Sequence, residues 1–220
     1  MKILITGAKG FIGKNLVADL KNRKYMDIFE YDKETEPSLL QEYCKEADFV
    51  FHLAGVNRPI EQSEFMEGNF GFTLTILNTL KKYKNTCPVM LSSSIQAEID
   101  NPYGKSKKVG EDLLFNYSKE TGAKVLVYRF PNVFGKWCRP NYNSAVATFC
   151  HNIAHDLPII VNDPSVVMNL VYIDDVVNEL INALKGKENI NGRFCEVPVI
   201  HTITLGEMAD LIYSFKRSRE

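Results

Sequence analysis

The chain has 220 residues, 45% of them hydrophobic, which is sufficient to bury a full core within one domain. Its 26 basic and 27 acidic side chains leave a net charge of −1, so neither nucleic acid nor an anionic membrane is expected as a partner. The five cysteines show no Cys-x-x-Cys or cysteine–histidine spacing, and we therefore expect no disulfide framework, no metal and a reduced, cytoplasmic environment.

The first segment of the chain predicts a strand, a glycine turn and a helix. Residues 1–6 are a short apolar run, too short for a signal peptide, and Gly7-Ala8-Lys9-Gly10-Phe11-Ile12-Gly13 follows at once. In such a turn Gly7 permits the tight bend, Gly10 lets the backbone approach a pyrophosphate, and Gly13 lets helix and strand pack closely. Free N–H groups at the start of the helix favour phosphate. The segment therefore predicts a dinucleotide-binding site.

The end of the next strand carries conflicting signals about the cofactor. Residues 28–31 are predicted as this strand, and Asp32 stands where an acidic residue binds the adenosine ribose of NAD. Lys33 follows it, and Lys9 lies in the glycine turn, where a cation could bind a 2′-phosphate. Because two lysines converge on this position, we expect NADP(H), with NAD(H) as the alternative.

A tyrosine and a lysine follow a run of three serines. Tyr103 and Lys107 are four residues apart, so on a helix they share one face. The lysine charge would lower the pKa of the phenol from about 10 and tune it as a proton donor to a carbonyl oxygen. Alternation along a strand puts Ser92 and Ser94 on one face and Ser93 on the other. A serine hydroxyl would hold the same oxygen as the tyrosine.

The remaining pattern alternates strands with helices, which is typical of an α/β fold with a doubly wound parallel sheet. The residue pattern changes at 136–163, a segment that includes a strand-like stretch at 158–161. We expect this segment to begin a small substrate lobe. Residues 174–184 are predicted to return as a helix on the main sheet. Thr204 and Glu207 predict the capping box of a last helix.

Six motifs, in this order, resemble those of the extended short-chain dehydrogenase/reductases, the NAD-dependent epimerase/dehydratase family. They are Thr6-Gly7-Ala8-Lys9-Gly10-Phe11-Ile12-Gly13, His52-Leu53-Ala54-Gly55, Ser92-Ser93-Ser94, Tyr103-Gly104-Lys105-Ser106-Lys107, Arg129-Phe130-Pro131-Asn132-Val133-Phe134-Gly135 and Tyr172-Ile173-Asp174-Asp175-Val176. The resemblance runs from Met1 to about Leu211 and implies a Rossmann-type fold with a small C-terminal substrate-binding lobe. Within the family the chain looks most like capsular-polysaccharide enzymes whose N-terminal domain reduces a UDP-linked 4-keto-6-deoxy hexosamine with NADPH.

The resemblance implies roles for individual residues. Tyr103 would be the proton donor, Lys107 the residue that lowers its pKa and binds the nicotinamide ribose, and Ser94 the hydroxyl on the reacting oxygen. Residues 53–55 would lie along the cofactor, with the backbone of Phe130 near the nicotinamide. With the residues named above, the candidate cofactor-binding set is Gly7, Lys9, Gly10, Phe11, Ile12, Gly13, Asp32, Lys33, Leu39, Leu53, Ala54, Gly55, Tyr103, Lys107 and Phe130.

The chain departs from the family pattern in two places that bear on the adenine and on the reaction. Residues 36–46 are predicted as one amphipathic helix where the family has a strand with an acid near the adenine. Leu39 or Leu40 would cover the adenine instead. Ile95-Gln96-Ala97 stands where the family's sugar dehydratases have an acidic pair, so a reductase is favoured over a dehydratase.

The substrate residues are a further expectation from the resemblance. Asn132 resembles a substrate-contacting asparagine. The basic residue that the family has before Tyr172 is missing here, so a substrate phosphate would have to be bound elsewhere. Arg58, Lys136 and Arg139 are the candidates for that charge.

The expected organisation is a dinucleotide-binding core of residues 1–135, completed by 164–198, and a substrate-side lobe of 136–163 and 199–220. The resemblance implies a homodimer. It also implies a C-terminal cupin-type domain in a longer protein, of which this chain would be the N-terminal part.

We therefore expect an NADP-dependent oxidoreductase that reduces a UDP-linked 4-keto-6-deoxy-N-acetylhexosamine. The product would be a UDP-2-acetamido-2,6-dideoxy sugar, such as the L-talose derivative, for capsular polysaccharide. Two alternatives stay open: a nucleotide-sugar epimerase that retains its NAD, and a sensor module that binds NAD(P) without turnover. The intact set of Ser94, Tyr103 and Lys107 favours the enzyme.

Overall fold

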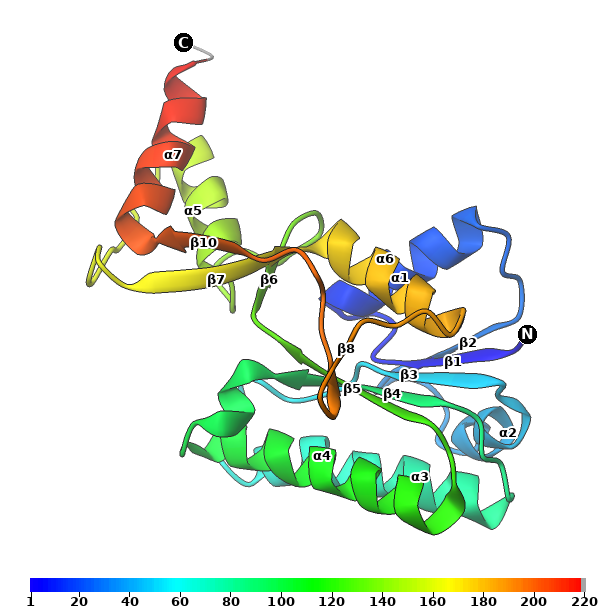
Figure 1. The fold of residues 1–220 in the computed structure, drawn as a ribbon. Coiled ribbons are helices and arrows are strands. Elements are labelled where there is room, and N and C mark those ends of the chain that lie inside the picture. The colour runs from blue at the N-terminus through cyan, green and yellow to red at the C-terminus, as the bar shows by residue number, and fades with distance from the viewer. Residues whose placement is uncertain (219–220) are drawn as a thin grey trace.

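A seven-stranded sheet lies at the centre of this computed structural model, which describes residues 1–218 (Figure 1). Its strand order is β2-β1-β3-β4-β5-β9-β8, and every neighbouring pair is parallel except β8 with β9. The strands are β1 (Ile3–Thr6), β2 (Ile28–Tyr31), β3 (Phe49–His52), β4 (Val89–Ser94), β5 (Val125–Phe130), β8 (Ile190–Asn191) and β9 (Phe194–Cys195). The expected doubly wound, Rossmann-type sheet is confirmed.

Helices cover both faces of this sheet, because each helix turns an apolar stripe toward it (Figure 1). α1 (Phe11–Asn22) and α6 (Ile173–Leu184) pack on one face, and α2 (Leu39–Glu46), α3 (Phe72–Lys82) and α4 (Pro102–Thr121) pack on the other. The central strands β1 and β3 are therefore buried along their whole length. Among the helices of residues 1–218, none is long and apolar enough to cross a membrane.

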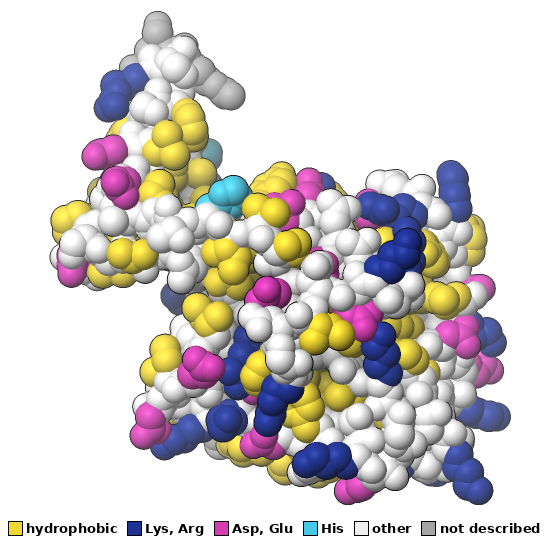
Figure 2. Space-filling view, in the orientation of Figure 1, with side chains coloured by type: hydrophobic (Ala, Val, Ile, Leu, Met, Phe, Trp, Pro, Cys, Tyr) yellow, Lys and Arg dark blue, Asp and Glu magenta, His cyan; other side chains and the backbone are white. Residues whose placement is uncertain are grey.

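A second, three-stranded sheet and two helices form a lobe that projects from the main sheet (Figure 1). β6 (Asn132–Phe134), β7 (Val167–Tyr172) and β10 (His201–Thr204) pair in the order β10-β7-β6, and α5 (Ala145–Ala154) packs against α7 (Leu205–Arg217). In the space-filling view the surface is hollowed beneath this lobe (Figure 2). The buried residues of the lobe form a small core of their own: Phe149, Ile153, Leu170, Met208, Ala209 and Ile212.

Two local expectations for the lobe have opposite outcomes. Thr204 Oγ1 accepts from Glu207 N at 3.2 Å, and Glu207 Oε2 accepts from Thr204 N at 2.9 Å, so the capping box is confirmed. The strand expected at residues 158–161 is wrong, because Ile159 and Val161 pack against the lobe core without pairing to a strand. The division of the chain into core and lobe segments stays a prediction, and residues 219 and 220 lie outside the described residues.

The carboxyl ends of four parallel strands meet at one edge of the main sheet. The glycine turn follows β1, residues 53–55 follow β3, Ser94 ends β4 and Phe130 ends β5. Two short helical turns, η1 (Met66–Gly71) and η2 (Ile95–Glu98), lie between the strands and the helices on this edge. Open α/β sheets bind their ligands at this edge, so the fold brings the predicted cofactor and catalytic segments to one place.

Candidate active site

The glycine turn leaves no room for side chains. Gly7 has a φ of +70°, and a Cβ atom there would lie 2.7 Å from the backbone N of Ala54. A Cβ atom at Gly13 would lie 2.2 Å from Gly7 O, so α1 approaches the turn more closely than any side chain allows. Gly10 is the N-cap of α1, and it has no side chain that could cap the first N–H groups of this helix. The first N–H groups of the helix are therefore available to a phosphate, and the turn fits the pyrophosphate of a dinucleotide.

The turn after β3 lies directly against the glycine turn. Leu53 N donates to Thr6 O at 3.1 Å, and Ala54 N donates to Thr6 Oγ1 at 3.4 Å. Phe11 and Ile12 open α1, and their side chains pack against the core beneath the sheet edge. What these two residues offer to a cofactor is therefore their backbone N–H groups.

Asp32 organises the backbone around the expected adenosine ribose. Its two carboxylate oxygens accept from Lys9 N and from Lys33 N, each at 2.9 Å. The Lys9 ammonium lies 2.6 Å from a carboxylate oxygen of Glu34. The structure therefore brings both lysines to the end of β2 but balances the charge of Lys9 with a carboxylate. Sequence reasoning missed Glu34, although its position beside Asp32 was visible.

The adenine and nicotinamide ends of the site each have one hydrophobic candidate. Leu40 is buried in the core beneath α2, whereas Leu39 is half-buried at the first turn of that helix and is the leucine left to contact a ligand. Phe130 is also buried, with its ring stacked on Tyr128 at 5.6 Å between centres. Only the backbone of Phe130 can therefore face a cofactor.

The structure brings together the three predicted catalytic residues. Asn101 caps α4 by accepting from Gly104 N at 2.7 Å, which places Tyr103 in the first turn of the helix. The side chains of Tyr103 and Ser94 lie within hydrogen-bonding reach of each other. Lys107, one turn further along α4, donates from Nζ to Ser92 O at 3.0 Å. β4 and α4 thus supply a hydroxyl pair with an ammonium beside it.

The electrostatics of this group differ from the expectation in one respect. Burial raises the pKa of Tyr103, with a smaller lowering by the hydrogen bond to Ser94, so the predicted lowering by Lys107 is wrong for this structure. The reason is geometric: Lys107 Nζ is held by the Ser92 carbonyl and lies 5.8 Å from the centre of the Tyr103 ring. Burial also lowers the pKa of Lys107 to about 8. A Cβ atom at Gly55 would lie only 3.0 Å from Lys107 Nζ, which shows how closely the two turns enclose the ammonium.

Two of the predicted substrate residues converge on a tyrosine that sequence reasoning missed. The guanidinium groups of Arg58 and Arg139 lie 5.5 Å and 5.3 Å from the centre of the Tyr142 ring. The Tyr142 hydroxyl donates to Asn57 Oδ1 at 3.1 Å and so joins the loop after β3 to the loop that enters the lobe. Neither arginine has an ion pair with any residue of the described chain. Asn132, exposed at the start of β6, donates to Asn169 O at 3.4 Å.

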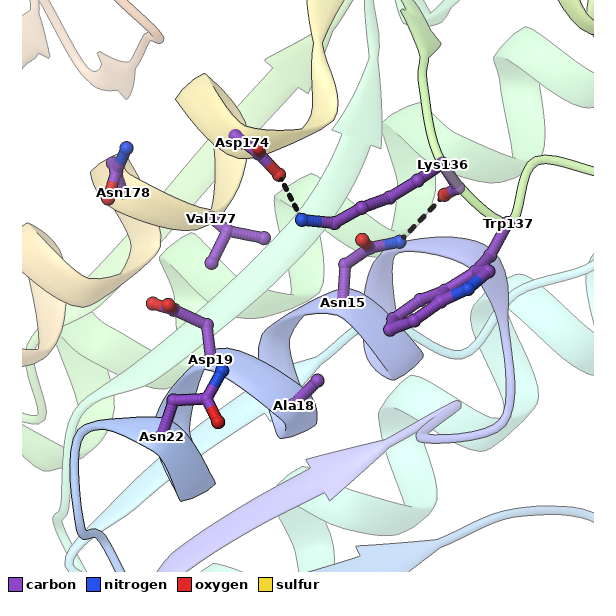
Figure 3. A pocket seen from close by; sticks show the side chains of 9 residues that line it. All are labelled: Asn15, Ala18, Asp19, Asn22, Lys136, Trp137, Asp174, Val177 and Asn178. Carbon is purple, nitrogen blue, oxygen red and sulfur yellow. Dashed lines mark hydrogen bonds and ion pairs between the residues drawn. The ribbon is translucent and has the colours of Figure 1, made fainter.

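Lys136 lies elsewhere, in the groove between α1 and α6 (Figure 3). Its ammonium is 2.9 Å from Asp174, and its carbonyl accepts from Asn15 Nδ2 at 3.2 Å. Tyr103 belongs to α4, in the helical layer on the opposite face of the sheet. The structure therefore does not bring Lys136 to the catalytic group, because the chain turns back over α1 after β6.

This fold and the geometry of its candidate site have known counterparts. The sequence profile of the NAD dependent epimerase/dehydratase family matches residues 3–195, from β1 to β9. The chain belongs to this family. Its parallel sheet, with a glycine turn after β1, is therefore that of an NAD(P)-binding Rossmann enzyme family.

Two of the following relatives are much longer than this chain. A UDP-2-acetamido-2,6-beta-L-arabino-hexul-4-ose reductase of Pseudomonas aeruginosa is 44% identical over 220 residues, which are 100% of this chain and 59% of the relative. The crystal structure of the capsular polysaccharide assembling protein CapF of Staphylococcus aureus matches with a TM-score of 0.90 and 47% identity, over 100% of this chain and 58% of that one. A Bacillus cereus UDP-glucuronic acid 4-epimerase in complex with NAD matches with a TM-score of 0.86 and 20% identity, over 99% of this chain and 83% of that one, and shows the shared fold.

Proposed function

We propose that this chain is the reductase part of an enzyme that converts a UDP-linked 4-keto-6-deoxy-N-acetylhexosamine to a UDP-2-acetamido-2,6-dideoxy sugar with NADPH. The observation that carries the proposal is the neighbouring pair of Ser94 and Tyr103 with Lys107 beside it, next to a glycine turn that fits a pyrophosphate. The Pseudomonas aeruginosa relative, named as a reductase of a 4-keto UDP sugar, supports the same substrate class. We further propose that the product is the L-talose derivative and that the enzyme acts in the synthesis of a capsule precursor.

The chemistry follows from what each residue can do. When bound, NADPH supplies the hydride for the carbonyl carbon. The hydroxyls of Ser94 and Tyr103, which lie beside each other, would both donate to the carbonyl oxygen as negative charge develops on it. Tyr103 is protonated at neutral pH, because burial raises its pKa, and it would give its proton to that oxygen. Lys107 would bind the nicotinamide ribose and add positive charge near the forming alkoxide.

The substrate diphosphate would be bound by Arg58 and Arg139. Both guanidinium groups face the Tyr142 ring and are exposed at the surface, so their donors can turn to an incoming anion. They belong to different loops, one after β3 and one entering the lobe, so a diphosphate between them would connect core and lobe. Asn132 would contact the sugar from the start of β6.

NADPH is proposed over NADH on the position of the two lysines at the end of β2. Each oxygen of the Asp32 carboxylate already accepts from a backbone N–H group, that of Lys9 or of Lys33, which draws both lysines to the end of β2. Lys9 would exchange its contact with Glu34 for the 2′-phosphate.

The proposal extends to assembly. The chain spans about three fifths of the length of the Pseudomonas aeruginosa reductase and of Staphylococcus aureus CapF. We expect a homodimer formed through α3 and α4, and a C-terminal cupin-type domain in the whole protein. Light scattering on the purified chain tests for the homodimer. A monomer at micromolar concentration would contradict it.

The decisive experiment follows nicotinamide absorbance with the UDP-linked 4-keto sugar and either NADPH or NADH. Oxidation of NADPH in preference to NADH is the expected result. Interconversion of UDP sugars with a copurified NAD and no net oxidation would instead identify an epimerase. Cofactor binding without any turnover of a sugar would identify a sensor module.

A further inference from the structure

The end of β4 and one face of α4 are joined by three contacts, one for each turn of the helix. Tyr103, Lys107 and Glu111 are spaced by four residues and so share a face of α4. Tyr103 lies within hydrogen-bonding reach of the Ser94 hydroxyl, and Lys107 donates to the Ser92 carbonyl at 3.0 Å. The third contact is from Glu111.

Glu111 is fully buried, which is unusual for a carboxylate, and both of its oxygens are bonded. Ser93 Oγ donates to Glu111 Oε1 at 2.5 Å. Arg129, on β5, donates from Nε to Oε1 at 2.9 Å and from Nη2 to Oε2 at 2.6 Å. A buried charge of this kind fixes its surroundings, because moving any partner would leave the charge without compensation.

The same arginine also holds the segment on the other side of the catalytic serine. Arg129 Nη1 donates to Glu98 Oε1 at 2.5 Å, and Glu98 ends η2, the turn that begins directly after Ser94. Ser94 is therefore flanked by two anchored residues: Ser93 before it, bonded to Glu111, and Glu98 after it, bonded to Arg129.

We propose that Glu111, held by Arg129, is a positioning residue that sets the register of Tyr103 and Lys107 against Ser94 and keeps Lys107 charged. Glu111 reaches none of the reacting atoms. It acts through the backbone of β4 and through its negative charge one helical turn beyond the ammonium of Lys107. The proposal rests on the proposed reductase function for its kinetic readout.

The charges around Lys107 support the second part of this role. Glu111 raises the pKa of Lys107 and opposes the lowering by burial. Tyr103 faces the ammonium from the preceding turn and stays neutral, because burial raises its pKa. His52 faces it from β3 and is also neutral, since burial lowers its pKa to about 3. Of these neighbours, Glu111 is thus the one that carries a compensating charge.

The test compares Glu111→Gln with Asp112→Asn, a change of the same charge at the next residue of α4. Asp112 is exposed and contacts Arg193 at the surface, so its variant should keep the parent kinetics. In Glu111→Gln we expect kcat to fall about 10–100-fold, because small displacements of catalytic groups have effects of this size. KM for NADPH should stay within about twofold of the parent. The decline of activity at alkaline pH should move to lower pH, since Lys107 loses its neighbouring anion.

Two further variants separate charge from position and protect the test against misfolding. Glu111→Asp keeps the charge but withdraws the carboxylate, so it should restore the parent pH profile and recover only part of kcat. Ser93→Ala removes only the contact to β4 and should lower kcat several-fold. If Glu111→Gln does not fold, a parent-like kcat in Ser93→Ala overturns the proposal, and a reduced kcat upholds it.

The proposal would also be overturned if folded Glu111→Gln had the turnover number and the pH profile of the parent, even with a lower thermal stability. If the parent itself fails to reduce the keto sugar, the proposed function fails, and the positioning role is then read from the pH dependence of NADPH affinity in Glu111→Gln and Asp112→Asn. If NADPH affinity declines at a lower pH in Glu111→Gln alone, the positioning role is supported. If the two variants give identical curves of NADPH affinity against pH, the positioning role is contradicted.

Discussion

The two sides of the active site differ in how their charges are balanced. On the catalytic side, each α4 side chain that faces the end of β4 has a partner within the protein, down to the buried Glu111 and Arg129. On the substrate side, Arg58 and Arg139 are exposed and share only the ring of Tyr142. The proposed catalytic group is thus preorganised by the fold, whereas the proposed substrate side has exposed guanidinium donors that could bind an anion. Preorganised groups change turnover when altered, and groups that bind the anion change KM.

The largest effect is expected from Tyr103→Phe, which removes the proton donor while keeping the ring. Turnover should fall about 10²–10⁴-fold, the usual contribution of general acid catalysis, with NADPH affinity nearly unchanged. Tyr117→Phe, on the same helix with its hydroxyl bonded to Asn85 O in the core, is the matched control. Strong residual activity of Tyr103→Phe in the absorbance assay would remove the catalytic assignment.

A smaller effect is expected on the substrate side. Arg58→Ala and Arg139→Ala should each raise KM for the UDP sugar about 10–100-fold, since hydrogen bonds to charged groups contribute about 1.5–3 kcal/mol. Because these residues do not touch the catalytic group, kcat should change little. Arg193→Ala is the control, an exposed arginine stacked on Phe115 away from the lobe. A fall in kcat with constant KM would contradict the division drawn above.

The cofactor lysines should give an effect of about tenfold. Lys9→Gln combined with Lys33→Gln should weaken NADPH binding by about that factor and leave NADH nearly unchanged, as expected for loss of a charged phosphate contact. Glu34→Gln should act in the opposite direction, because it frees Lys9 from its ion pair. Dissociation constants from fluorescence titration of both cofactors decide the matter, and equal losses for the two would show that the lysines do not read the 2′-phosphate.

The smallest effect is expected from pH. The pKa of Lys107 is lowered to about 8 by burial, so its charge, and activity with it, should decline as the pH rises through that value. Tyr103 stays protonated over this range because its own pKa is raised. The fall between pH 7 and 8.5 should be about fourfold in the rate of keto-sugar reduction. Lys107→Arg should be slower but should lose this alkaline decline, since its guanidinium stays charged; an unchanged decline would assign it to another group.

Local features of the sequence were predictable because they depend on residues close together in the chain. The glycine turn follows from the φ of +70° at Gly7 and the contact at Gly13, which side chains could not accommodate. The spacing of Tyr103 and Lys107 follows from the period of a helix, and the capping box of α7 from Thr204 and Glu207. The alternation of strands and helices determined the parallel sheet.

Contacts between distant segments were decided only by the tertiary structure. Lys107 binds the Ser92 carbonyl, and Lys9 binds Glu34, because the register of β4 against α4 and of β2 against the glycine turn places them there. The expected lowering of the Tyr103 pKa was wrong for the same reason. Lys136 was expected at the substrate and lies beside α1 instead.

The sequence alone thus determined the family and the fold and predicted the candidate catalytic residues, because glycine turns and helical spacing are short-range properties. The tertiary structure decided which charges meet. Arg129 and Glu111 are 18 residues apart in the chain, and no local pattern indicates that they join beneath Ser93. Pairing of buried charges depends on how strands and helices pack, and the preorganisation of the site is a property of that packing.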